Sequence, residues 1–414
     1  MDTQRLHTQL LAHAGRLLLE YNESTGEICR TLAATARALT HDECDVAVFY
    51  SGVTVELAGE VPLRMPIREL RYNAALQARV HAILRQVRSR ELDPSAALEQ
   101  LQGVETQTPP ISRWLTMLLF GFAAASLAGL LGGDYGTVIV SGMAAALGLL
   151  VRQQLGRWHF SVLSLPLAGG FVGAVLGGLA IRFGWTQTPE LALIVPSLML
   201  IPGPHLINGL LDLVDNYVPM SIARLGLAIS ILVAISLGIV LGIELTLPEP
   251  PLVDQSVKTD HLNVIVDMIL AGIVTIGFAV YYNTAPVHLA MAAVGGIAGH
   301  GARFLALEMG AGLVPATFVG AIAVGIIAAW IVRSYKAPFA VIAFAGAVTM
   351  MPGLQIYRAL SGTLRLARLQ EGIALPSITG TLGFAFQAGL VVIALVTGLI
   401  IASRAVQLLA GEQD

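Results

Sequence analysis

The chain has 414 residues, of which 55% are hydrophobic and only 12% are charged, and its mean hydropathy is +0.74. This composition is typical of a polytopic membrane protein with one soluble end. The net charge of -3 and the lack of a basic run argue against nucleic-acid binding. Neither lysine, Lys258 nor Lys336, lies in a glycine-rich phosphate-binding loop, so the chain is not a P-loop ATPase.

Residues 1–110 predict a small mixed α/β (α+β) domain. An amphipathic helix runs to about Tyr21, and Ser24 and Glu27 have capping-box spacing at the start of a second helix. The other expected elements are two strands over 44–59 and helices over 67–90 and 93–102. The first 40 residues contain no long apolar core followed by a cleavage site, so we expect this domain to stay in the cytoplasm.

Ten apolar segments of membrane-spanning size follow, and a polar stretch divides them five and five. They lie near 114–133, 136–151, 160–182, 190–213, 221–246, 263–282, 287–301, 312–333, 338–358 and 378–403. The expected units are therefore a five-helix repeat over 111–246, a loop over 247–262 and a second five-helix repeat over 263–414.

The two halves resemble each other. The matches are MAAALG from Met143 with MAAVGG from Met291, FVGAV from Phe171 with FVGAI from Phe318, and Pro202-Gly203 with Pro352-Gly353. Three matches in order, at shifts of 148, 147 and 150, indicate an internal duplication. Because each unit has an odd number of spans, the second copy enters the membrane in the opposite direction, which predicts an inverted repeat typical of transporters.

The orientation of the spans is weakly determined. With the N-terminus in the cytoplasm, seven basic residues lie near inner ends of segments and six near outer ends. We therefore base the inner-membrane orientation on the missing signal peptide.

The fourth and ninth segments are expected to be interrupted. Pro202 and Pro204 lack an amide hydrogen and Gly203 relaxes the backbone between them, so the helix should break about 20 Å from Pro189. Pro352 and Gly353 predict the same break in the second copy. Unpaired backbone groups are tolerated at this depth only where protein or a watery cavity receives them, so the breaks indicate an interior site.

Polar side chains follow each break on one helix face. In the first copy they are His205, Asn208, Asp212 and Asp215, and the matching positions of the second copy are Gln355, Arg358, Gly362 and Arg365. Charges at bilayer depth usually face a pathway or a partner. Alternatives stay open: Asp212 and Asp215 could end a solvated helix, His205 could be a satisfied interior histidine, and Arg358, Arg365 and Arg368 could anchor a loop to headgroups.

Two further charged residues are candidates. Asp267 lies one turn inside the sixth segment and is an isolated protonatable group. Arg224 follows the short turn NYVPM and can pair with Asp212 or Asp215, which we interpret first as a structural ion pair.

These motifs resemble the threonine/serine exporter family over nearly the whole chain. They are PGPHLINGLLDL with IARLG downstream, MPGLQIYRAL in the second half, and ESTGEICRTL in the N-terminal domain. The matched motif residues are Pro202, Gly203, Asn208, Gly209, Asp212, Arg224, Pro352 and Gly353, and Ser24 and Thr25 match a Ser-Thr pair that we interpret as helix caps. The resemblance implies proton-driven export of small hydroxy amino acids, or of succinate in some two-subunit relatives.

The leading hypothesis is a secondary exporter in a bacterial inner membrane. Asp212 would face the ammonium group of threonine or serine and Arg358 the carboxylate, while Asn208 and Gln355 bond the hydroxyl. The proton-coupling candidates are Asp212, Asp267 and His205. A dicarboxylate substrate would instead give Arg358 and Arg365 the main role. Besides substrate, protons and lipid, a second copy of the chain is a possible partner.

A membrane-anchored hydrolase is the alternative of another class. The stretch HDECD offers His41, Glu43, Cys44 and Asp45 as crowded metal ligands. No second cluster has zinc spacing, and ten duplicated spans exceed what an anchor needs. We therefore expect no metal, no cofactor and no enzymatic activity, with Cys29 and Cys44 as reduced thiols.

Overall fold

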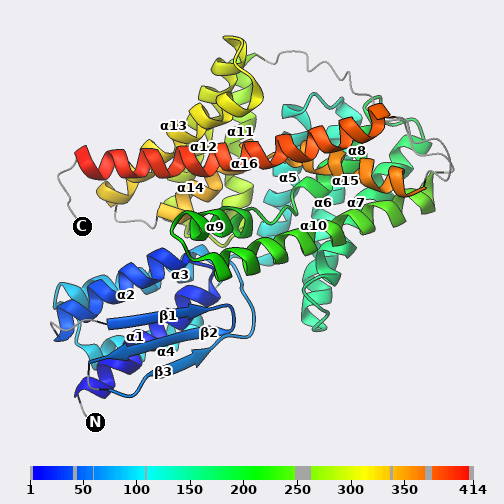
Figure 1. Ribbon diagram of the computed structural model, residues 1–414. Coiled ribbons are helices and arrows are strands. Elements are labelled where there is room, and N and C mark those ends of the chain that lie inside the picture. The colour runs from blue at the N-terminus through cyan, green and yellow to red at the C-terminus, as the bar shows by residue number, and fades with distance from the viewer. Residues whose placement is uncertain are drawn as a thin grey trace.

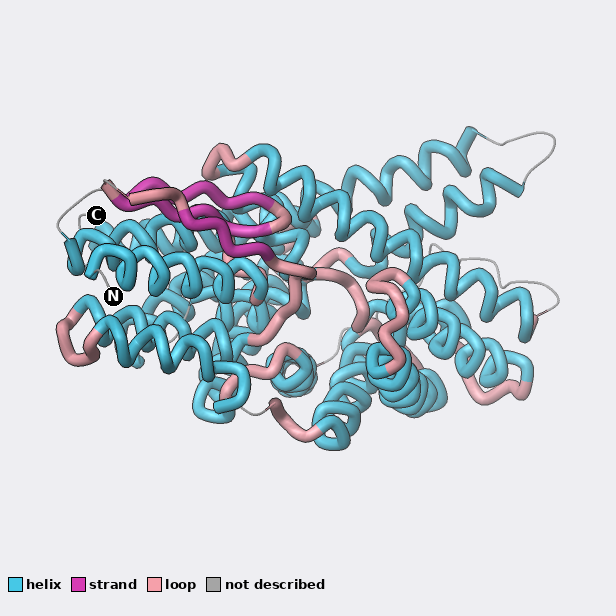
Figure 2. Tube along the Cα trace, turned by 90° about the horizontal axis from the view of Figure 1, so that it is seen from below, coloured by secondary structure: helices cyan, strands magenta, loops and turns pink. Residues whose placement is uncertain are grey.

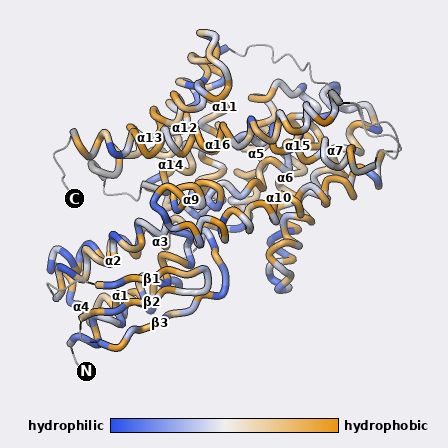
Figure 3. Tube along the Cα trace, viewed as in Figure 1, coloured by the Kyte–Doolittle hydropathy of each residue, from blue (hydrophilic) through white to orange (hydrophobic). Residues whose placement is uncertain are grey.

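The computed structural model describes residues 3–40, 44–58, 60–107, 110–247, 263–335, 339–368 and 375–409. Most of them are helical, and a smaller N-terminal domain lies against one end of a larger set of apolar helices (Figure 1). Hydrophilic and hydrophobic segments alternate in the N-terminal domain, whereas hydrophobic ones dominate the larger part (Figure 3).

The N-terminal domain combines four helices with a three-stranded antiparallel sheet of order β1-β2-β3. Its elements are α1 (Thr3–Glu20), α2 (Thr25–Thr40), β1 (Cys44–Phe49), β2 (Gly52–Leu57), β3 (Leu63–Pro66), α3 (Ala74–Arg88) and α4 (Pro94–Gln107). Figure 2 shows the three strands side by side, with helices along one face of the sheet. The core forms around α1, whose Leu10, Leu11, Leu17 and Leu18 are completely buried among the other three helices and β2.

Two features of this domain differ from the sequence expectation. The strand β3, which pairs with β2, was not expected, because its four residues are too short to show an alternating pattern. Helix α3 begins at Ala74 and not near Ile67, since the Asn73 side chain accepts a hydrogen bond from Leu76 N at 3.1 Å and caps the helix there.

The larger part contains the long apolar helices. They are α5 (Arg113–Leu130), α6 (Tyr135–Arg157), α7 (Ser164–Arg182), α8 (Pro189–Leu198), α9 (Gly203–Val214), α10 (Val218–Thr246), α11 (Val264–Tyr281), α12 (Pro286–Glu308), α13 (Leu313–Tyr335), α14 (Phe339–Ala347), the 3-10 helix η1 (Val348–Met350), α15 (Gly353–Arg368) and α16 (Leu375–Leu409). Both expected interruptions are present, one between α8 and α9 and one between α14 and α15.

The expected count of ten membrane-length helices is not reached in the described part of the chain. Eight helices there are long and apolar enough to cross a membrane, and α8 with α9 forms a bent pair at 63°, which gives nine at most. The breaks explain the difference, because α8 has 10 residues and α14 has 9, whereas a span needs about 20. The chain is nevertheless a multi-pass membrane protein.

The helices of the two halves have corresponding neighbours. Helix α7 packs against α6 and α10, and α13 packs against α12 and α16; α9 lies on α10 as α15 lies on α16. Helices α5 and α11 pack against each other and join the halves.

The two interruptions lie next to each other inside the protein. A Cβ atom added to Gly203 would lie 3.1 Å from Met351 Cε, and one added to Gly353 would lie 2.9 Å from Ile201 Cδ1. Each break therefore packs on the chain of the other, which protects the backbone groups that the breaks free.

Candidate functional site

Three polar side chains lie completely buried after the first break. Asn208, Asp212 and Arg224 each have 0% exposure, and Arg224 Nε lies 3.3 Å from Asp212 Oδ2. Asn208 and Asp212 are four residues apart on α9, so they face the same side of that helix.

The turn between α9 and α10 brings Arg224 to this face. Asn216 has a positive φ of 64°, and Tyr217 N donates to Asp212 O at 2.7 Å, so the chain reverses directly after α9. Gly209 permits the close approach of the two helices, because a Cβ there would lie 2.9 Å from the Leu225 side chain.

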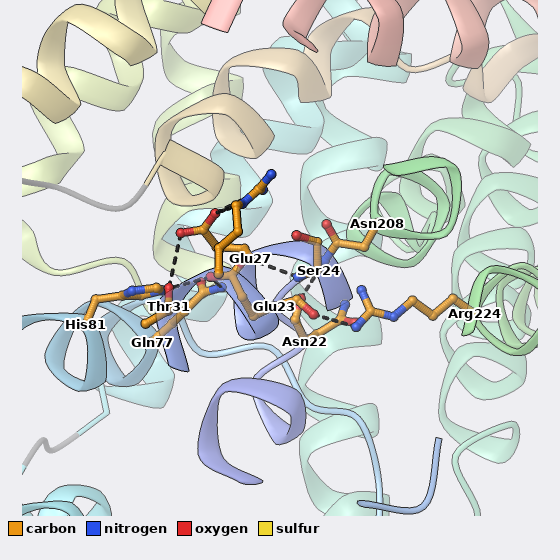
Figure 4. A network of polar contacts seen from close by, with 10 residues as sticks. Asn22, Glu23, Ser24, Glu27, Thr31, Gln77, His81, Asn208 and Arg224 are labelled. Carbon is orange, nitrogen blue, oxygen red and sulfur yellow. Dashed lines mark hydrogen bonds and ion pairs between the residues drawn. The ribbon is translucent and has the colours of Figure 1, made fainter. Parts of the chain in front are cut away.

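The N-terminal domain covers this face with the turn between α1 and α2, residues 21–25. Asn22 has a positive φ of 62°. Its backbone carbonyl oxygen accepts a hydrogen bond from Asn208 Nδ2 at 2.5 Å, and the backbone carbonyl oxygen of Glu23 accepts one from Arg224 Nη2 (Figure 4). Thr25 N donates to Asp212 Oδ1 at 2.8 Å. The polar face of α9 therefore meets the N-terminal domain and not the polar face of α15.

The start of α2 points at the carboxylates of α9. Thr25 is the first residue of α2, and a Cβ added to Gly26 would lie 2.2 Å from Asp215 Oδ2. A helix N-terminus carries partial positive charge and unpaired amides, which stabilise a nearby carboxylate. Asp212 is thus held by two positive partners, the α2 terminus and the Arg224 guanidinium.

Glu23 fixes the covering turn from inside the N-terminal domain. Its carboxylate accepts from Gln77 Nε2 at 2.6 Å and Ser24 N at 3.1 Å, and lies 3.0 Å from His81 Nε2 (Figure 4). Burial raises the pKa of Glu23, but these hydrogen bonds outweigh it, so the pKa lies below the ordinary value. The expected capping box between Ser24 and Glu27 is not formed. Ser24 N donates to the Glu23 carboxylate instead, and the Glu27 carboxylate accepts a hydrogen bond from Arg30.

The lowered pKa of Glu23 predicts acid sensitivity. A carboxylate with a depressed pKa stabilises the folded state above its ordinary pKa, about 4.5, and that contribution is lost as the pH falls through the folded value. We expect the difference in melting temperature between the wild-type protein and Glu23→Gln to be largest near neutral pH and to shrink below about 4.5. Glu27→Gln, at a half-exposed carboxylate, is the control; an unchanging difference for Glu23→Gln would contradict the prediction.

A second contact fastens the N-terminal domain to the end of α11. Ala74 N donates to Tyr282 O at 2.9 Å and Asn283 Nδ2 donates to Asn73 Oδ1 at 2.9 Å, while the Tyr72 and Tyr282 rings meet edge to face at 4.6 Å. The α9–α10 turn and the α11–α12 turn thus lie on the same side of the membrane part, which we call the domain side.

Arg358 does not face Asp212. It donates to Glu190 from Nε at 3.1 Å and from Nη2 at 3.3 Å, so the pair joins α15 to the first turn of α8. Its guanidinium also lies 5.4 Å from the Phe384 ring. The opposed substrate-binding pair expected from the sequence is therefore replaced by two separate ion pairs.

The remaining candidates are distributed over other contacts. His205 Nδ1 lies 3.4 Å from Asn22 Nδ2, and Gln355 is partly buried on α15, one turn before Arg358. Asp267 lies 3.0 Å from His300 Nε2 of α12. The side chains of Arg365 and Arg368, and the residues His41 and Glu43, lie outside what the structure describes.

The covered site contains polar atoms that lack hydrogen-bond partners. They are Asn22 Oδ1, Thr25 Oγ1, Asn208 Oδ1 and Arg224 Nη1. Buried polar groups without partners are costly, so their concentration at one place suits a small polar ligand or a proton that enters the site. Within the described ranges no group of three His, Cys, Asp or Glu residues could hold a metal ion.

Sequence reasoning missed Asn22, Glu23 and Glu190 as members of these networks. The sequence offers one signal at Asn22, because an asparagine between two helices favours a positive φ. No signal connects it to Asn208, because the two residues are 186 positions apart.

Comparisons with known proteins agree over both halves. The family described as "Putative threonine/serine exporter" matches residues 9–246, and the one described as "Threonine/Serine exporter, ThrE" matches residues 267–405. No solved structure matches the chain.

Three curated relatives illustrate the range of the matches. The threonine/serine exporter of Corynebacterium glutamicum is 23% identical over 86% of this chain and 75% of its own length. The probable threonine/serine exporter of Mycobacterium tuberculosis is 24% identical over 86% and 70%. The probable succinate transporter subunit YjjP of Escherichia coli is 22% identical over 58% of this chain and 95% of its own length.

Proposed function

Because the chain belongs to the threonine/serine exporter family, we propose that it exports threonine and serine across the bacterial inner membrane, driven by the proton motive force. The observation that carries this proposal is the completely buried Asp212–Arg224 pair, which joins the helix after the first break to the helix that follows it. The N-terminal domain lies on the cytoplasmic side, where substrate is loaded.

We propose that the membrane part is an inverted repeat of five and five segments. The corresponding neighbours of α7 and α13, and of α10 and α16, support this arrangement. Alternating access then follows from rocking of one repeat against the other around the two adjacent breaks.

The two repeats differ in charge at equivalent positions. Asp212 is ten residues after Pro202, and its counterpart ten residues after Pro352 is Gly362, where a Cβ would lie 2.2 Å from Thr381 Oγ1. Thr381 is the seventh residue of α16, as Arg224 is the seventh of α10. The acid and base therefore belong to one repeat only, and we assign the coupling step to that repeat.

Asp212 is the proposed proton-coupling residue. Its carboxylate holds both Arg224 and Thr25 N, so protonation would weaken the contact between the N-terminal domain and α9. Asp267, with His300 as partner, and His205 remain candidates for the same role.

Asn208 offers its amide to the substrate hydroxyl on the domain side. Gln355 and Arg358 belong to the opposite side, where the Glu190 pair is positioned as a gate.

A dicarboxylate substrate is the second candidate. The resemblance to the probable succinate transporter subunit covers 95% of that relative's length and 58% of this chain. This candidate assigns Arg358 to substrate binding and Asp212 to coupling or gating.

Efflux from proteoliposomes tests the function. Purified protein in vesicles loaded with threonine, serine, succinate or a neutral control should release the amino acids under a proton gradient. The pH of the vesicle lumen should change in proportion to the threonine released. Asp212→Asn should reduce threonine efflux at least about 100-fold, as expected when a coupling proton is lost. Efflux of succinate alone would establish the second candidate, and unchanged efflux by Asp212→Asn would exclude its coupling role.

A further inference from the structure

Arg152 is a partly buried arginine that the proposed mechanism does not use. It lies in α6, five residues before the helix ends at Arg157, or about 8 Å inside that end. Its Nη2 donates to Tyr281 Oη at 3.0 Å, and its guanidinium lies 5.8 Å from the Tyr281 ring. Its Nε and Nη1 are buried and have no hydrogen-bond partner.

Arg152 also lies beside the first helix break. A Cβ added to Gly169 would lie 2.6 Å from Leu200 Cδ1 and 3.0 Å from Arg152 Cδ. The stem of the Arg152 side chain thus lies against Gly169 of α7, which also contacts Leu200 in the segment that connects α8 to α9. The guanidinium at its tip contacts Tyr281, the last residue of α11.

Charge compensation distinguishes Arg152 from the other arginines near the breaks. Arg224 pairs with Asp212, and Arg358 pairs with Glu190. Arg152 has no acidic partner in the described part of the chain, although an uncompensated charge inside a membrane is costly. A carboxylate that enters from outside the chain would supply the missing counter-charge.

We propose that Arg152 binds the carboxylate of the transported substrate on the domain side. A guanidinium presents parallel donors that match the two oxygens of a carboxylate, and here the unpartnered Nε–H or Nη1–H forms such a pair with the second hydrogen of Nη2, whose other hydrogen binds Tyr281. Because Tyr281 Oη accepts a bond from Arg152, its hydroxyl proton can be donated to the same ligand. Both an amino acid and a dicarboxylate carry this group. The inference rests on the proposed function and adds the residue that recognises the substrate's acid group.

Binding to purified full-length protein tests this assignment. Threonine and succinate should each raise the melting temperature of the wild-type protein if they bind, whereas threoninamide, which lacks the carboxylate, should not. Arg152→Gln should weaken binding of the carboxylate ligand by about 10- to 100-fold, the effect of losing a charged hydrogen-bond partner. Arg152→Lys, which keeps the charge but not the fork, should lose less.

The control is Arg157→Gln, an exposed arginine of the same helix, which should bind as the wild type does. Tyr281→Phe keeps the ring and removes the hydroxyl, so it should weaken binding several-fold and tests the site even if Arg152→Gln fails to fold. Equal binding by wild type, Arg152→Lys and Tyr281→Phe would overturn the proposal, as would wild-type binding of threoninamide. Binding that depends on Arg152 without any efflux would leave this inference in place and contradict the transport proposal.

Discussion

Arg224→Ala is expected to lower the stability of the protein by about 3 to 5 kcal/mol, because it removes the charged partner of the buried Asp212 carboxylate. Both side chains have 0% exposure, so water does not screen the loss. The substitution also removes the bond from Arg224 to Glu23 O, which joins the membrane part to the N-terminal domain. The melting temperature in detergent and the susceptibility of the 21–25 turn to proteolysis are the measurements.

A double-mutant cycle separates the pair from the rest of the site. Asp212→Ala combined with Arg224→Ala should be more stable than Arg224→Ala alone, since no unpaired charge remains. Arg182→Ala, at an exposed arginine that ends α7, is the matched control and should change little. If Arg224→Ala lowered the stability no more than Arg182→Ala does, the buried pair would not stabilise the fold.

Gly238→Ala is expected to separate α10 from α7. An added Cβ would lie 2.1 Å from Leu167 O and 2.8 Å from Phe171 N, and backbone atoms cannot move aside as a side chain can. Small residues at such contacts allow helices in membranes to approach closely. Overpacking of this kind costs about 1 to 3 kcal/mol, so the melting temperature should fall by several degrees.

The same helix supplies the control. A Cβ added to Gly226 of α10 meets nothing within 4 Å, so Gly226→Ala should leave the melting temperature unchanged or raise it. Equal melting temperatures for the two variants would contradict the close packing of α10 on α7.

Much of the membrane part could be predicted from local signals. Proline and glycine at 202–204 and at 352–353 act on their own backbone, so both interruptions could be located without a structure. The count of ten spans is not confirmed in the described part of the chain, because the helix before each break is too short to cross a membrane alone. Strand β3 was missed because four residues carry too little pattern.

The sequence by itself determined which residues are apolar over membrane length, where two helices break, and that Asn208 and Asp212 share a face of α9. These properties follow from composition and from the 3.6-residue period, which relate a residue to its own helix. Only the tertiary structure decided the partners. Thr25 N binds Asp212 across 187 positions, and Arg358 binds Glu190 across 168, so the expected wall of opposed charges became two separate pairs. Helical periodicity specifies which way a side chain points but not what it meets, and that depends on how distant helices and the N-terminal domain pack.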